Sequence, residues 1–94
     1  MTNCEYTVEV NTLRELRMSY GRDWDITGSR TIITTETVET AAAVFGCVCY
    51  DEARYSDRLA LDERVAVSLV KWPETGYGET LQYAEFDHDG RVER

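Results

Sequence analysis

The sequence is poor in the residues that build many recognisable sites. It has one lysine, Lys71, one histidine, His88, and one proline, Pro73. The 18 acidic residues outnumber the 10 basic ones, which gives a net charge of -8. This balance argues against direct binding of DNA or RNA, because phosphate affinity depends largely on clustered Lys and Arg. The chain suits a basic protein or a nucleoprotein complex as its partner.

Long apolar runs and targeting patterns are also missing. No stretch of about 18 apolar residues predicts a membrane span, and the N-terminus lacks the pattern of a signal peptide. The three cysteines, Cys4, Cys47 and Cys49, are an odd number without an export signal, which is typical of a reducing compartment. We therefore expect a cytoplasmic protein that does not bind membranes.

What the chain does contain is enough apolar surface for one core. Its 94 residues are 43% hydrophobic and 11% aromatic, so residues 1–94 are expected to form a single domain without disulfides or metal.

Periodicity predicts several strands. Residues 4–10 alternate between apolar and polar, and residues 30–35 are rich in β-branched side chains. The clearest strand is 64–72, which is apolar on both faces and therefore central in its sheet. The turn formers in 73–78 connect it to a further strand at 79–87, and the two are expected to pair as a hairpin. The polar tail that follows is expected to fray.

The remaining segments predict two helices and a loop. Thr12 and Glu15 have capping-box spacing, which indicates a short helix ending before Gly21, and residues 21–30 are predicted to be a surface loop. A longer helix is predicted over 36–53 with Thr35 as its N-cap, although residues 43–50 could instead form a buried strand. Ser56 could cap one further helical turn over residues 57–61.

Together these elements predict an α+β fold in the order β-α-β-α-β-β, with helices on one face of a mainly antiparallel sheet. Its core is expected to contain Val38, Phe45, Val65, Val67 and Val70.

No residue pattern predicts a cofactor, a metal site or a catalytic residue. Cys47 and Cys49 would point about 200° apart on a helix and cannot chelate one ion together, so we expect the cysteines to pack. The acids around His88, at positions 85, 87 and 89, resemble part of a calcium loop but lack the rest of an EF-hand. With no nucleophile and base to pair, and no glycine-rich phosphate loop, we expect a protein that is not an enzyme.

The acidic residues themselves are the remaining signal. An acidic helix face carrying Glu36 and Glu39 could imitate the phosphates of nucleic acid, and aromatic residues in the two loops could anchor a partner. The candidate partner-binding residues are Asp23, Trp24, Asp25, Glu36, Glu39, Tyr77, Glu85, Asp87 and Asp89. Two plainer interpretations remain: the acids serve only solubility, and Trp24 is simply buried under its loop.

A short, acidic α+β chain without a catalytic signature resembles the small phage-encoded inhibitors of bacterial defence, anti-CRISPR proteins above all. The resemblance is in size, charge and absence of chemistry. Neither MTNCEYTV nor ETVETAAAVFGCVCYDEAR carries a family motif, so it assigns no functional residue. It implies an inhibitor that binds a nucleoprotein effector, often across surfaces meant for nucleic acid. Two alternatives stay open: a module that self-associates through a sheet edge, and a small enzyme with a pocket lined by titratable groups.

Overall fold

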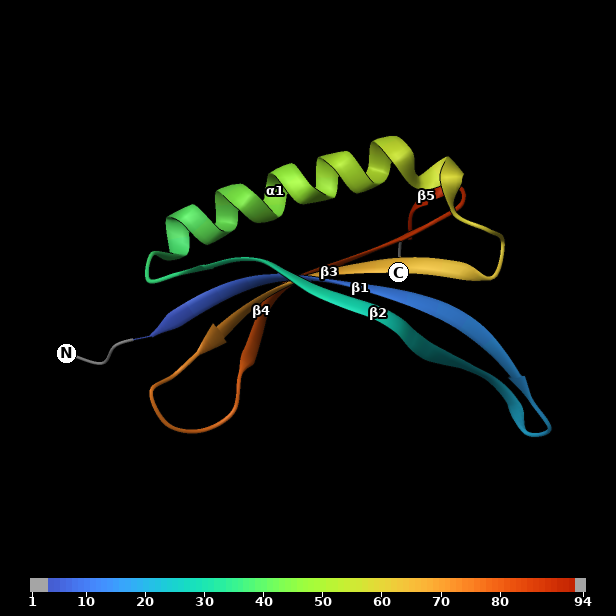
Figure 1. The fold of residues 1–94 in the computed structure, drawn as a ribbon, viewed down its shortest axis with the longest axis horizontal. Helices are drawn as coiled ribbons and strands as arrows, with labels where there is room; N and C mark the ends of the chain where they lie inside the picture. Colours follow the sequence, from blue (N-terminus) through green and yellow to red (C-terminus); the bar gives the residue numbers. More distant parts are fainter. Residues whose placement is uncertain (1–3, 93–94) are drawn as a thin grey trace.

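The computed structural model describes residues 4–92, which form a five-stranded antiparallel sheet with a helix lying along one face (Figure 1). The strands are β1 (Glu5–Met18), β2 (Gly21–Thr35), β3 (Glu63–Trp72), β4 (Glu79–Asp87) and β5 (Gly90–Arg91). Their order in the sheet is β2-β1-β3-β4-β5. The helix α1 (Val38–Tyr55) is followed by a 3-10 turn, η1 (Ser56–Arg58). The α+β class and the antiparallel sheet are confirmed, whereas the predicted element order is wrong.

The error lies in the first third of the chain, where the predicted helix (12–20) and the predicted loop (21–30) are both strand. They form the long β1–β2 hairpin. β1 also pairs with β3 from Glu5 to Arg14, so it is hydrogen-bonded on both sides over that length. This long-range pairing overrides the helix propensity of the segment. Gly21, at a φ of 137°, is the residue of the tight turn that permits the hairpin.

The long helix is confirmed, and the alternative of a buried strand at 43–50 is wrong. α1 begins two residues later than predicted, with Thr37 rather than Thr35 at its N-cap. Glu36 therefore precedes the helix and does not share its face with Glu39. The further helical turn is confirmed as η1, but its bounds differ from the prediction: Ser56 is its first residue rather than its cap, Tyr55 holds the N-cap position, and the turn ends at Arg58.

The β3–β4 hairpin is confirmed as well. β3 is the third strand of five, and its register sets Val65 opposite Phe86 and Val67 opposite Ala84. Part of the tail turns back as β5, and the Val92 amide donates to the Glu85 carbonyl. Residues 93–94 lie outside the described part of the chain.

The core lies between α1 and the sheet. Buried side chains from three strands and the helix form it: Val8, Val10, Ala41, Phe45, Val65, Val67, Leu69, Ala84 and Phe86. One predicted core residue is misplaced. Val38 is 37% exposed at the first turn of α1. Val70 is buried, but it pairs with Thr7 and so lies on the face of the sheet away from α1. We call this second face the open face, because α1 covers only the other side (Figure 1).

Candidate functional site

Three strand ends meet at one end of the sheet and enclose a cavity of about 350 Å³. Because β1 runs antiparallel to β2 and β3, its first residues lie beside the last residues of both strands. The lining comes from the start of β1, the β2–α1 connection and the end of β3 with the loop after it: Cys4, Glu5, Glu36, Trp72, Pro73 and Glu74. We call it the acidic cavity. The start of β1, the β2–α1 connection and the end of β3 lie together at the left of Figure 1.

Trp72 is the aromatic wall of the acidic cavity, and its indole is fixed in place. Its Nε1 donates a 2.8 Å hydrogen bond to Thr7 Oγ1, whose own hydroxyl donates to Glu9 Oε2 at 2.9 Å. Gly78 backs the ring so closely that a Cβ there would lie 2.8 Å from Trp72 Cζ3. The residue nevertheless stays 41% exposed. The cavity thus offers a preorganised aromatic surface to a ligand.

The charge of the acidic cavity is uncompensated. Glu5, Glu36 and Glu74 are all exposed, and none of them forms an ion pair with another residue in the range 4–92. Three solvated carboxylates around an indole attract a cation by Coulomb forces and by the quadrupole of the ring. Such a cavity is suited to a Lys or Arg side chain.

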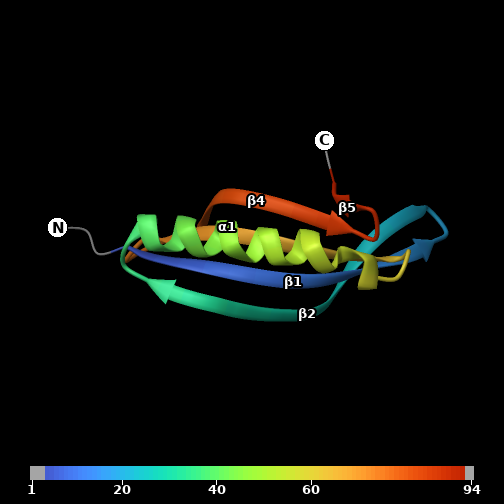
Figure 2. The same ribbon diagram turned by 90° about the horizontal axis from the view of Figure 1, so that it is seen from above.

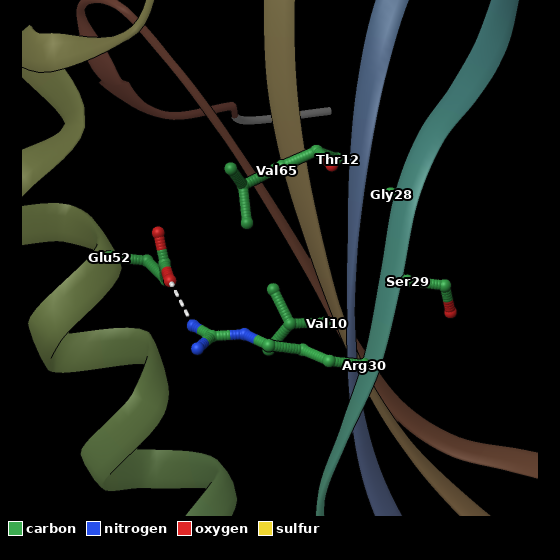
Figure 3. Close-up of a pocket in the computed structure, with 7 residues that line it drawn as sticks. All are labelled: Val10, Thr12, Gly28, Ser29, Arg30, Glu52 and Val65. Atoms are coloured by element: carbon green, nitrogen blue, oxygen red, sulfur yellow. Dashed lines mark ion pairs between the residues drawn. The ribbon is translucent and has the colours of Figure 1, made fainter.

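A second cavity, of about 280 Å³, lies between the C-terminal half of α1 and the sheet. Figure 3 shows Glu52 and Arg30 facing each other across it, 3.9 Å apart, while the Ser29 side chain points away. Burial raises the pKa of the Glu52 carboxyl, and the guanidinium of Arg30 partly opposes that rise. The walls are otherwise Val10, Val65, Thr12 and Gly28. This cavity contains no nucleophile beside a base, so its geometry gives little support to catalysis.

The structure scatters the predicted partner-binding residues. Asp23, Trp24 and Asp25 lie in β2 rather than in a loop, and Glu39 is exposed on the first turn of α1. Tyr77, 96% exposed, belongs to the loop that also supplies Pro73 and Glu74 to the acidic cavity. Glu36 lines that cavity directly.

Trp24 is neither a free anchor nor covered by a loop. It is half-buried, and the guanidinium of Arg64 lies 4.5 Å from its ring centroid. Arg64 Nη1 is also 3.2 Å from Glu85 Oε2, and the Tyr83 hydroxyl donates to Glu85 Oε1. Glu85 is 8% exposed. The Trp24, Arg64 and Glu85 side chains therefore serve to brace the open face across three strands.

The other acids near the C-terminus form a turn rather than an acidic row. The Asp89 amide donates to Asp87 Oδ1 at 2.8 Å, which closes the turn between β4 and β5. His88 Nδ1 donates to the Leu59 carbonyl at 2.8 Å and so ties this turn to the segment after η1. This arrangement is structural.

The cysteines are free thiols in three different settings. Cys47 is exposed on α1, whereas Cys49 packs against the core and Cys4 lines the acidic cavity. The expectation that the cysteines pack is thus wrong for Cys47, since its position on the helix faces solvent. Burial raises the pKa of the Cys49 thiol, opposed by Arg91. Among residues 4–92 no group of three His, Cys, Asp or Glu side chains is placed to hold a metal ion.

Comparison with known protein families, curated proteins and solved structures finds no match. The site must therefore be interpreted from its own chemistry. Within the described range, no helix has both the length and the apolar character needed to cross a membrane.

Sequence reasoning missed three members of the acidic cavity, Glu5, Trp72 and Glu74. The two glutamates were available as charges, but their proximity depends on the register of β1 against β3, which sets Glu5 opposite Trp72. The Trp-Pro-Glu sequence at the end of the central strand was the one local signal, because an aromatic at a strand end before a turn is well placed for contact.

Proposed function

We propose that this protein acts by binding, as an inhibitor that sets its carboxylates against a basic, nucleic-acid-handling surface of a partner, in the manner of anti-CRISPR proteins. The observation that carries the proposal is the acidic cavity, where Glu5, Glu36 and Glu74 surround the indole of Trp72. The net charge of -8 favours the same class of partner.

The cavity matches the two parts of a long basic side chain. An Arg or Lys of the partner places its aliphatic stem against Trp72 and Pro73 and its charged head among the glutamates. The carboxylates are solvated before binding, so their contribution falls mainly on association rate and specificity. The affinity comes from burying the fixed indole, because little side-chain entropy is lost there.

The binding step is best tested with purified RNA-guided nucleases, whose heteroduplex channel is lined with positive charge. A panel of such complexes is mixed with the protein, and both target-DNA cleavage and binding kinetics are measured. We expect stoichiometric inhibition of at least one complex, with an association rate that falls as salt is raised from about 50 to about 500 mM.

Charge reversal identifies the surface that binds. The variant E36K/E74K removes two carboxylates of the acidic cavity, and D51K/D57K makes the same change in net charge at exposed positions near the other end of α1. We expect the first variant to slow association about tenfold more than the second. Equal effects would show that only net charge matters. If neither variant alters binding, or no nuclease is inhibited, the proposal is wrong.

A further inference from the structure

β2 is an edge strand over its whole length. It pairs with β1 on one side, and Figure 2 shows it as the outermost strand of the sheet. Its 15 residues leave a long row of backbone amides and carbonyls for another strand. We propose that two copies of this chain pair antiparallel through β2 and form one continuous sheet. The inference is independent of the proposed function.

The hairpin is longer than its own sheet can support. The pairing of β1 with β3 ends at Arg14 and Glu63, so residues 15–24 form a two-stranded arm that projects beyond α1 (Figure 1). The arm exposes Tyr20 by 77% and Met18 by 43%. A two-stranded ribbon is marginal in water, and a third strand stabilises it. The arm therefore needs a neighbour along its free edge.

The register of β2 on β1 decides which residues share a face. Asp25 pairs with Arg14, and Arg30 pairs with Val10, so both lie on the α1 side of the sheet. Four other residues of β2 lie on the open face. They are residues 24, 26, 29 and 31, which pair with Glu15, Leu13, Asn11 and Glu9. β2 has an irregularity at residue 27, which pairs with no residue of β1. The open face therefore carries even-numbered residues before it and odd-numbered residues after it.

One two-fold register keeps these faces matched and pairs opposite charges. It sets Asp25 of each copy opposite Arg30 of the other, so two Asp–Arg pairs form across the axis, with each Arg30 also 3.9 Å from Glu52 of its own chain. Trp24 then lies opposite Thr31, and Ile26 opposite Ser29, all on the open face. The bulged residue 27 falls beside residue 28 of the second copy, at the axis itself. Strand β2 is thus complementary to itself.

The same register places the arm of each copy beside the other copy's sheet. Residues 21–24 of one copy lie next to residues 31–34 of the other, but a second irregularity of β2, at residue 32, shifts its register between Val8 and Glu9. Arg22 lies on the open face and Ile33 on the α1 side, so the matched pairing between the copies ends at Trp24 and Thr31. A second copy of this chain suits the free edge of β2, because β2 itself carries both the acidic residue, Asp25, and the basic residue, Arg30, of the proposed pairs.

Sedimentation of the full chain tests the pairing between about 10 µM and about 1 mM. We expect a concentration-dependent dimer. D25R and R30D each create like charges at two places and should weaken dimerisation about tenfold or more, whereas the swapped chain D25R/R30D and an equimolar mixture of the two single variants should restore it. Asp57→Arg and Arg17→Asp are matched controls outside β2.

Hydrogen exchange on the unmodified chain provides a second measurement. Amides in residues 24–31 should exchange more slowly at high concentration than at low concentration, and those of α1 should not change. A monomer throughout the concentration range overturns the proposal. So does a dimer that persists in both single variants, or whose protected amides lie outside β2.

Discussion

Gly78→Ala tests the support of the acidic cavity. A Cβ at Gly78 would lie 2.8 Å from Trp72 Cζ3, 2.9 Å from Trp72 Cε3 and 2.9 Å from Val70 Cγ1. Val70 is buried and β-branched, so the indole is the group that moves. Its movement breaks the hydrogen bond to Thr7 Oγ1.

The magnitude follows from three opposing terms. Overpacking costs about 1–3 kcal/mol. The lost hydrogen bond adds about 1 kcal/mol. The lower entropy of the unfolded alanine chain returns about 0.4–1 kcal/mol. We therefore expect a net loss near 2 kcal/mol, or about 10 °C in Tm for a chain of this length. Gly46→Ala is the matched control: nothing lies within 4 Å of its added Cβ, so this exposed helical site should gain about 0.5–1 kcal/mol.

Urea denaturation of both variants measures these differences, and a Trp72→Leu background isolates the clash. In that background the cost of Gly78→Ala should be smaller, because the crowded ring and its hydrogen bond are gone and only the 2.9 Å approach to Val70 Cγ1 remains. Were Gly78→Ala as stable as the unmodified protein, or its cost unchanged without the indole, the packing of Trp72 on Gly78 would not be the constraint described.

Three further substitutions or labels probe the rest of the molecule. Arg64→Met should cost about 1–3 kcal/mol in chemical denaturation, since it removes the ion-pair partner of the buried Glu85; a neutral result would show that this pair adds nothing. Because burial raises the pKa of Glu52, its ionised form is disfavoured in the folded state and the penalty is relieved as pH falls through that pKa. Glu52→Gln should therefore be at least as stable as the unmodified protein at pH 7, and its advantage in Tm should shrink towards about pH 4; a gap that widens on acidification would contradict this sign. Iodoacetamide should label exposed Cys47 before Cys49, because burial raises the pKa of the Cys49 thiol and keeps it protonated. Mass spectrometry of the labelled chain measures the order, and the reverse order would refute the placement of these side chains.

Local pattern was sufficient where one segment carries its own periodicity. The alternation in 64–72 predicted a central strand and its two faces, and β3 has both. The apolar spacing in 36–53 predicted α1, because a helix buries residues three and four apart against whatever lies beneath it. Phe45, Val65 and Val67 were consequently placed in the core correctly.

Local pattern failed where the deciding partner is distant in sequence. The Thr12–Glu15 spacing is favourable for a helix, yet β3 and β2 pair with β1 on both sides and make this segment a strand. Trp24 was predicted in a loop, but the length of the hairpin carries it into β2 beside Arg64.

The sequence by itself determined the acidic charge, the α+β class, a helix over most of 36–53 and the β3–β4 hairpin, since each depends on composition or on contacts between near neighbours in the chain. Only the tertiary structure decided which charges meet. Glu5, Glu36 and Glu74 come from three separate elements, and the free edge of β2 exists because β1 takes the place between β2 and β3. Both surfaces depend on strand order and register, which are set by the free energy of the whole sheet rather than by the preference of any one segment.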